Sequence, residues 1–287
     1  MKKRKKKKNT ISVFLFVRGE NVVEFYNRCI DIYDDYRAHI PSYASAALSF
    51  YLLLLLVPAT SLFAVGASFF KLDLTIVERL IEQYIAAEYV DVILNILQTN
   101  TMNTVAFVTL LLSLYTVSRG VRHIYDLSRN MYGESEDENI FEYYMYSIKV
   151  TILLLVLFLG FVAIFAVKPL AQLFNSLYAI VGIRHILLYF ILVVILMMIY
   201  KVVPRTKIGY EESFKGALIA GALLLILYYG LQIYFQFASF QTIYGPLASI
   251  VAVLFVFNLG AEIFYIGMYT TYIFYLRRKE DERDSHH

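Results

Sequence analysis

A long apolar run near the C-terminus dominates the pattern of the chain. No charged side chain occurs between residues 216 and 261, and the run ends at Glu262. About 20 apolar residues are enough to cross the hydrocarbon core of a bilayer, so the run is too long for one span. Gly and Pro interrupt it at residues 241–246, where the sequence reads QTIYGP. The pattern therefore predicts two membrane-spanning helices joined by a tight turn.

Similar apolar runs, each bounded by charged residues, predict six transmembrane helices in all. The expected spans are about 43–69, 104–117, 150–167, 186–200, 213–237 and 247–275. Two further segments, 20–39 and 74–98, alternate apolar and charged residues at helical spacing, which is typical of amphipathic helices on a membrane surface. We expect segment 74–98 on the outer side. The predicted fold is an all-α integral membrane protein with a six-helix domain over 40–276, a basic tail over 1–19 and a second tail over 277–287.

Positive charge is concentrated on one predicted side of the membrane. The basic block of residues 2–8 falls on this side, as do 22 of the 26 Lys and Arg residues in all. Such an asymmetry predicts that both termini are cytoplasmic. We expect the basic block to contact anionic lipid headgroups rather than nucleic acid, and membrane lipids to be the main partners. The sequence is compatible with both a monomer and a homo-oligomer.

The composition agrees with a membrane protein. Hydrophobic residues make up 59% of the chain and the mean hydropathy is +0.60, which lies outside the range of soluble globular domains. The single cysteine, Cys29, excludes an intramolecular disulfide and a Cys-rich metal site. Because the chain has no Trp, its 25 Tyr residues must supply the aromatic belts at the membrane interfaces.

Polar side chains inside the predicted spans are the candidates for a transport pathway, because they are costly in lipid and usually face a bundle interior or a watery cavity. Glu262 and Asn258 lie one helical turn apart in span six, and Gln232 and Gln236 do so in span five. Glu262 is expected about 22 Å from the outer end of its span, where it would pair with Lys149 or reach a water-filled vestibule. The alternatives are a structural ion pair for Glu262 and interhelical hydrogen bonds for the two glutamines.

Helix-breaking residues mark candidate hinges or kinks. Pro58 lies within span one, where a proline frees a backbone carbonyl and bends a helix. Gly245 and Pro246 lie in the predicted turn before span six. Small residues are expected at helix contacts; these are Ser42, Ser45 and Ser49 in span one and Gly216, Gly221 and Gly230 in span five.

Catalytic motifs are missing from the sequence. It contains no P-loop, dinucleotide fingerprint, HExxH motif or nucleophile elbow. His39, His123 and His185 lie far apart in the sequence and on different predicted sides or surfaces, which argues against a metal-dependent hydrolase. We therefore expect neither an enzyme nor a cofactor or metal.

An ordered set of short motifs resembles the YihY/BrkB family of bacterial inner-membrane proteins over about residues 40–275. The motifs are ALSFY at residues 47–51 followed by Pro58, then Asn130-x-Tyr132-Gly133, then Pro204, Gly216-Ala217, Tyr234 and Tyr244-Gly245. Tyr51 belongs to the first of them. The chain departs from the family pattern at Leu55 and Val256. The family's Gly-Ala-Glu aligns with residues 267–269, whereas Gly260-Ala261-Glu262 lies seven residues earlier, on nearly the same helix face but about 10 Å away.

The resemblance implies six transmembrane helices in a bacterial inner membrane and no assigned substrate. The family has also carried a ribonuclease label, but no cluster of carboxylates or histidines in this sequence offers a metal-assisted phosphodiester site. The favoured interpretation is that the protein is a transporter or exporter of a lipid or other amphiphilic envelope component. The alternatives are a non-transporting scaffold or regulator of envelope assembly and, disfavoured, a membrane-associated nuclease.

Overall fold

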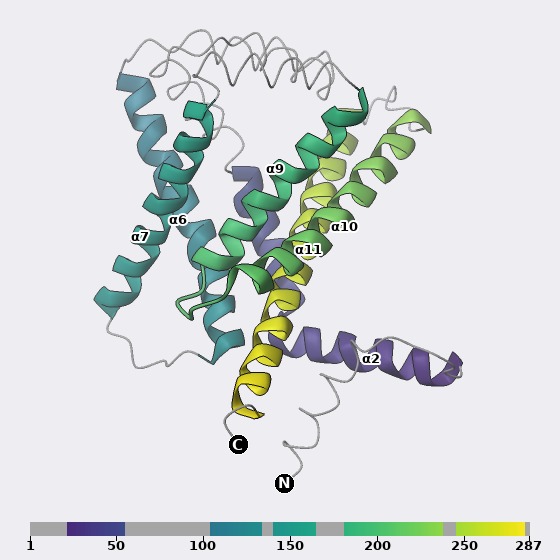
Figure 1. The fold of residues 1–287 in the computed structure, drawn as a ribbon. Coiled ribbons are helices and arrows are strands. Elements are labelled where there is room, and N and C mark those ends of the chain that lie inside the picture. The colour runs from purple at the N-terminus through teal and green to yellow at the C-terminus, as the bar shows by residue number, and fades with distance from the viewer. Residues whose placement is uncertain (1–21, 55–103, 134–139, 165–180, 238–244, 285–287) are drawn as a thin grey trace. The chain divides into compact units, whose positions relative to one another are not determined.

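The computed structural model describes residues 22–54, 104–133, 140–164, 181–237 and 245–284 (Figure 1). Every regular element in these ranges is an α-helix, so the all-helical class is confirmed for this part of the chain. The helices are α2 (Val22–His39), an unlabelled helix (Tyr43–Leu54), α6 (Thr104–Tyr132), α7 (Ile140–Ile164), α9 (Val181–Val202), α10 (Tyr210–Phe237) and α11 (Gly245–Asp284).

Two helices in the described ranges are long and apolar enough to cross a membrane, judged by length and composition. They are Tyr210–Tyr234 and Val253–Asp284, which correspond to predicted spans five and six. Two shorter apolar helices, Tyr43–Leu54 and Tyr189–Val202, overlap predicted spans one and four. The six-span count stays a prediction, as do the surface helix over 74–98 and the basic tail over 1–19, which lie outside the described residues.

Several helices extend beyond the spans that the hydropathy pattern predicts. Helix α6 continues through the charged segment after residue 117, α7 begins at Ile140 and includes Lys149, and α11 continues through the predicted C-terminal tail. Charged residues limit the apolar segment that fits in lipid, but they do not stop backbone hydrogen bonding. Helix α6 ends at Gly133, whose φ of 66° is the left-handed conformation typical of a helix C-terminus.

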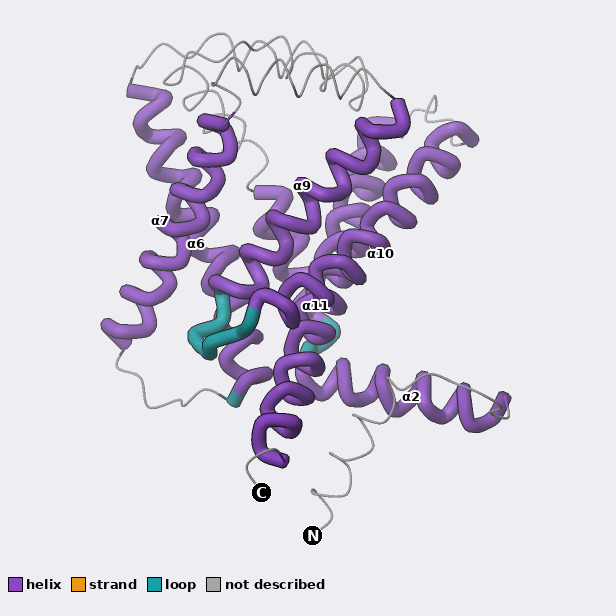
Figure 2. The backbone as a smooth tube through the Cα atoms, in the orientation of Figure 1, coloured by secondary structure: helices purple, strands orange, loops and turns teal. Residues whose placement is uncertain are grey.

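The chain divides into two compact units. The first comprises Met1–Ser49, Tyr125–Glu136 and Leu192–His287, and the second comprises Phe50–Ile124 and Asp137–Ile191. In the first unit the buried side chains gather on residues 261–275 of α11, where Ala261, Tyr265 and Met268 are almost fully buried. Figure 2 shows the loop of residues 203–209 that joins α9 to α10 beside α11.

Helices α10 and α11 pack through small residues. A Cβ atom at Gly216 would overlap Thr271 Oγ1 and lie 2.5 Å from the carbonyl oxygen of Gly267. A Cβ atom at Gly267 would overlap Tyr200 Oη and lie 2.6 Å from Ala220 Cβ. Only glycine fits at these two positions, because each allows one backbone to approach another helix closely.

Helix α9 joins the same contact through Tyr200, whose hydroxyl donates to the carbonyl oxygen of Phe264 at 2.8 Å. The expectation of close approach is thus confirmed for Gly216. For Gly230, no described residue lies within 4 Å of a Cβ atom placed there, so close approach at this position stays a prediction, as it does at Gly221.

In the second unit, aromatic contacts connect the helices. The guanidinium of Arg122 in α6 lies 4.5 Å from the ring centroid of Tyr144 in α7. The ring of Tyr51 packs 5.9 Å from that of His123 and contacts the position of a Cβ atom at Gly120. A basic residue stacked on a ring retains its charge while its stem and ring exclude water.

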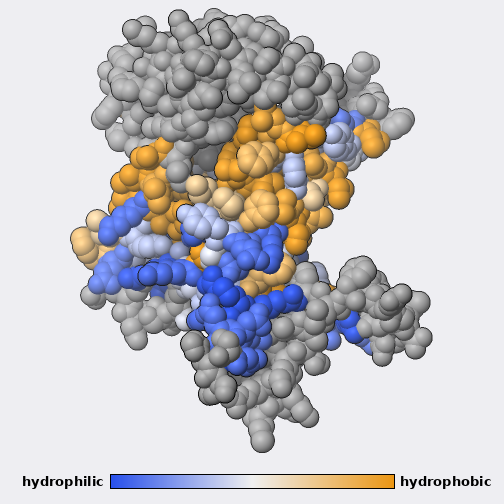
Figure 3. Space-filling view, in the orientation of Figure 1, coloured by the Kyte–Doolittle hydropathy of each residue, from blue (hydrophilic) through white to orange (hydrophobic). Residues whose placement is uncertain are grey.

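The surface of the first unit separates into apolar and hydrophilic parts. Figure 3 shows apolar side chains over α9 and α10, and hydrophilic side chains where the 203–209 loop meets the C-terminal part of α11. Exposed apolar residues on α10 include Ile226, Ile233 and Tyr234. This distribution is what a helix pair with one end in lipid and the other in water requires.

Candidate functional site

The carboxylate of Glu262 in α11 is the centre of a polar cluster. Its Oε1 atom lies 2.8 Å from Arg37 Nη2 and accepts a hydrogen bond of 3.0 Å from Tyr36 Oη. Its Oε2 atom accepts a hydrogen bond from Ser45 Oγ. We call these four residues the Glu262 cluster. It joins α11 to α2 and to the helix Tyr43–Leu54, which are more than 200 residues away in the sequence.

The bend between α2 and the next helix brings the three donors together. Pro41, between the two helices, cannot continue a helix because it lacks an N–H group. The N–H of Ile40 still donates to the carbonyl oxygen of Tyr36 at 2.8 Å, which closes the last turn of α2. Tyr36 and Arg37 therefore lie in the last turn of α2, and Ser45 lies in the first turn after the bend.

Aromatic rings hold the guanidinium of Arg37 in place. Its central carbon lies 5.3 Å from the ring centroid of Tyr33 and 5.1 Å from that of Tyr36. Its Nε atom donates to Tyr33 Oη at 3.2 Å. Its Nη1 atom is buried and has no hydrogen-bond partner among the described residues. Arg37 thus has donor capacity that no described residue uses.

The Glu262 cluster lies at a surface rather than in a sealed core. The side chains of Arg37 and Glu262 are 27% and 22% exposed. Burial raises the pKa of Tyr36 above its usual range, and the negative charge of Glu262 raises it further. The phenol therefore stays protonated and donates to the carboxylate, so the cluster combines one carboxylate, one cation and two hydroxyl groups within reach of solvent.

A second acid ties the same helices together in the opposite direction. Asp35 in α2 accepts a hydrogen bond of 2.5 Å from Tyr269 Oη in α11. The rings of Tyr36 and Tyr269 meet edge to face at 5.4 Å, and the ring of His39 packs 5.2 Å from Tyr272. Each helix thus contributes an acid to the other, and Tyr and His rings fill the space between them.

Within the described part of the first unit, neither Asn258 nor Gln232 forms a hydrogen bond or ion pair with Glu262. Asn258 lies one turn before Glu262 on α11 and is half-buried. Gln232 is exposed on α10 and donates to Tyr228 Oη of its own helix at 2.6 Å. The side chain of Gln236 lies outside the described residues. Lys149 is exposed on α7 in the second unit, whereas the ion-pair partner of Glu262 is Arg37.

The hinge candidates and the serine candidates differ in their place along the helices and in their exposure. Pro58 lies outside the described residues. Gly245 and Pro246 are the first two residues of α11, a place that accepts proline because the first N–H groups of a helix have no intrahelical partner. Ser42 is exposed, whereas Ser45 and Ser49 are buried. Ser49 Oγ donates to a carbonyl oxygen of its own helix at 2.8 Å.

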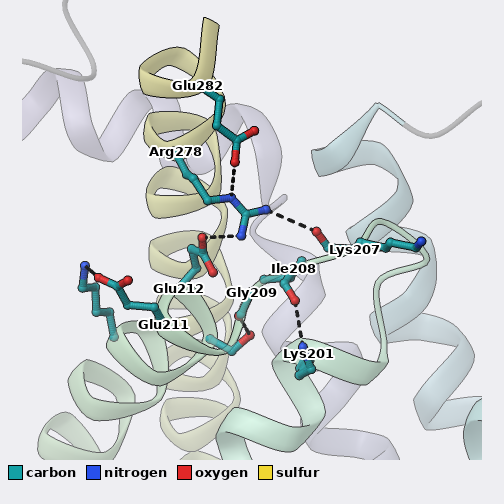
Figure 4. A network of polar contacts seen from close by, with 10 residues as sticks. Lys201, Lys207, Ile208, Gly209, Glu211, Glu212, Arg278 and Glu282 are labelled. Carbon is teal, nitrogen blue, oxygen red and sulfur yellow. Dashed lines mark hydrogen bonds and ion pairs between the residues drawn. The ribbon is translucent and has the colours of Figure 1, made fainter. Parts of the chain in front are cut away.

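A second polar network, which we call the Arg278 clamp, holds the 203–209 loop against α11 (Figure 4). Arg278 Nη1 lies 2.7 Å from Glu212 Oε1, Nη2 donates to the carbonyl oxygen of Lys207 at 3.5 Å, and Nε lies 3.4 Å from Glu282 Oε1. Lys201 Nζ donates to the carbonyl oxygen of Ile208 at 3.0 Å. The clamp fixes the start of α10 on the C-terminal part of α11.

The residues of the family-like motifs have mostly structural roles. Tyr132 packs edge to face on Tyr272 at 5.2 Å, next to Gly133, which ends α6. Pro204 is buried in the loop that the Arg278 clamp holds. Gly216 makes the close contact between α10 and α11. The others are half-buried Tyr51, exposed Asn130 and Tyr234, the helix-starting Gly245, and Tyr244, which lies outside the described residues.

Sequence reasoning missed most of the partners of Glu262. The sequence pattern predicts only that Asp35, Tyr36 and Arg37 belong to a surface helix over 20–39. The order Tyr-Arg shortly before a helix-breaking Pro was the one available signal, and it is weak. Within the described residues, no three His, Cys, Asp or Glu side chains gather closely enough to hold a metal ion.

Comparison with known proteins agrees with the motifs. None of the curated proteins or solved structures that were compared with the chain matches it. The family described as Virulence factor BrkB matches residues 32–287, which is most of the chain and includes every residue of the Glu262 cluster and the Arg278 clamp. The resemblance to the YihY/BrkB family is thereby confirmed, and the chain belongs to the Virulence factor BrkB family.

Proposed function

We propose that this membrane protein is a transporter or exporter of a lipid or another amphiphilic envelope component. The observation that carries the proposal is the Glu262 cluster, a partly exposed ion pair on a helix that is otherwise uncharged from Gly245 to residue 276. A carboxylate near the middle of a membrane helix costs about 2.5–3.5 kcal/mol by insertion scales, so its presence favours a functional role.

The chemistry around the cluster fits an amphiphile. The guanidinium of Arg37 is partly exposed, and its charge would favour an anionic headgroup. Towards the N-terminus of α11, Val251, Val253 and Phe255 are exposed. Phe255 lies seven residues before Glu262, about 10 Å along the helix axis and on nearly the same face. A headgroup at Arg37 and an acyl chain along this apolar face would follow one continuous path.

We place the protein in the bacterial cytoplasmic membrane as a multi-pass protein with both termini in the cytoplasm. The support is the charge asymmetry of the sequence together with the two membrane-length helices. In this orientation the Glu262 cluster lies in the cytoplasmic half of the membrane, where it would take up its substrate from the inner leaflet.

Substitution of the carboxylate tests the proposal. In proteoliposomes, Glu262→Gln should lower the rate of movement of a fluorescent phospholipid between leaflets by about tenfold or more, because one charge-assisted interaction contributes about 1.5–3 kcal/mol. Proton flux should be recorded in the same vesicles, since a carboxylate can couple transport to protons. Insertion should be unchanged.

The matched control is Glu280→Gln, which neutralises an exposed carboxylate of the same helix. It should leave the transport rate at the wild-type level. Wild-type transport by Glu262→Gln would exclude the proposed role of this cluster, and lipid movement no faster than in empty vesicles for the wild-type protein would exclude transport of the lipid tested.

The second candidate function is a non-transporting scaffold or regulator of envelope assembly. It is favoured by the exposure of most of α2, which leaves a helix surface free for a partner. Deletion of residues 2–8 separates the two functions. A scaffold that acts through its tail should lose activity in cells, whereas a correctly inserted transporter should keep most of its transport rate in vesicles.

A further inference from the structure

Helix α2 consists of an anchored end and a projecting part. Its last turns, from Asp35 to His39, contact α11 through the bonds to Glu262 and Tyr269. The preceding turns are mostly exposed and project away from α11 (Figure 1). Because these turns gain little stability from packing on the described part of the chain, we take their sequence pattern as a guide to what they meet outside it.

One stripe of the projecting part is apolar. Tyr26, Ile30 and Tyr33 follow one another at intervals of four and three residues and are 64%, 39% and 56% exposed. Cys29 is exposed within the same stripe. Asp31 is exposed on the opposite side of the helix. The projecting part is thus amphipathic, and its apolar stripe stays exposed although Arg37 stacks on Tyr33.

We propose that the apolar stripe of α2 docks on an anionic lipid surface, the cytoplasmic face of the membrane that holds the protein. This interaction goes beyond the proposed transport function and does not depend on it. Tyr and Ile side chains at helical spacing suit the boundary between headgroups and acyl chains, where Tyr places its ring in the apolar layer and its hydroxyl in the polar layer.

The anchor contacts α11 between Glu262 and Tyr272, in the cytoplasmic half of its apolar part and within about 22 Å of the residues that end it. Tyr residues gather there, since Tyr36 packs on Tyr269, and Tyr132 packs on Tyr272 and Tyr275. Three basic residues at 277–279 follow directly. A tyrosine belt followed by basic residues marks the cytoplasmic headgroup layer of a membrane protein. A helix attached at this belt is positioned to lie along the surface.

The charge of the N-terminal segment favours anionic lipid in particular. Residues 1–39 contain ten Lys and Arg residues against five Asp and Glu residues, and seven of the ten are in the block at residues 2–8. Helix α2 itself is slightly acidic. The attraction to anionic headgroups must therefore come from the preceding basic block, and the apolar stripe supplies the insertion.

A second copy of the chain is a less suitable occupant. A stable protein interface buries about 800 Å² on each partner. Three side chains of this size bury about 150–250 Å² each at most, which leaves the stripe below that area. A lipid surface has no such requirement, because the transmembrane domain already holds the helix next to it.

The single cysteine allows a test on the native sequence. Cys29 can be labelled with an environment-sensitive fluorophore, and the full-length protein can then be reconstituted into vesicles of phosphatidylcholine with or without phosphatidylglycerol. The matched control carries the label on the opposite side of the same helix, in the double variant Cys29→Ser/Asp31→Cys. Quenchers are brominated lipids for the bilayer and iodide for the aqueous phase.

The expected result is a blue shift of the label at Cys29 in vesicles that contain phosphatidylglycerol, with quenching by brominated lipid and protection from iodide. The label at position 31 should remain accessible to iodide. Deletion of residues 2–8 or high salt should reduce the shift. Equal iodide quenching at positions 29 and 31 in anionic vesicles would overturn the proposal, and so would efficient Cys29–Cys29 cross-linking between two copies.

Discussion

Helix α11 makes two contacts of different kinds. Its contact with α10 is formed by small residues, because Gly216 and Gly267 let the two backbones approach closely. Its contact with α2 is formed by acids and their donors, with Glu262 bound to Arg37 and Tyr36, and Asp35 bound to Tyr269. An added side-chain atom would not fit in the contact between α10 and α11. In the contact between α11 and α2, one hydrogen bond can be replaced by another.

This difference indicates which contact of α11 is the more rigid one. Close packing in the interior fits one arrangement, since even one extra methylene group disturbs it. A partly exposed ion pair contributes less to the free energy of unfolding than close packing does, because water and other ions compete for its charges. The α10–α11 pair is therefore the frame of the first unit, and the α2 contact is its adjustable part.

The largest effect is expected from a side chain in the glycine contact. In Gly216→Val, the added atoms would overlap Thr271 and approach the backbone of Gly267, so the free energy of unfolding should fall by about 3 kcal/mol. Thermal unfolding in detergent, followed by size-exclusion chromatography, measures the change. The matched control is Gly230→Val on the same helix, which meets open space among the described residues and should change stability by less than about 0.5 kcal/mol.

The next effect is expected at the Arg278 clamp. Arg278→Met leaves the carboxylate of Glu212, whose side chain is only 7% exposed, without its cation, so stability should fall by about 2 kcal/mol. Adding Glu212→Gln removes the uncompensated charge and should restore part of the loss. A loss that is the same with Glu and with Gln at position 212 would show that the two side chains are not coupled.

The smallest effect is expected in the α2 contact. Tyr269→Phe removes the hydrogen bond to Asp35 and should cost about 1 kcal/mol, since neighbouring ring contacts remain. Hydrogen exchange in the last turns of α2 should become faster while exchange in α10 stays unchanged. Tyr229→Phe, which alters an exposed tyrosine of α10, is the control. Faster exchange throughout α10 would place Tyr269 in the fixed frame instead.

The apolar pattern predicted the helices well and their ends poorly. The predicted span 213–237 agrees with α10, but α11 continues nine residues past the predicted end at residue 275. Hydropathy measures where lipid surrounds a helix, while backbone hydrogen bonds decide where the helix ends. A glycine in the sequence likewise does not show whether it lies at a helix contact. Gly216 and Gly230 belong to one helix, but among the described residues only Gly216 closely approaches α11.

The sequence alone determined the class of the protein and its most informative residue. An uncharged run that ends at Glu262 predicts helices in a membrane and makes that carboxylate unusual, because both inferences depend on the local cost of charge in lipid. Only the tertiary structure decided that Tyr36, Arg37 and Ser45 bind it. Partners more than 200 residues apart meet through helix packing, and a helical pattern read along the chain contains no information about which distant turn a side chain will meet.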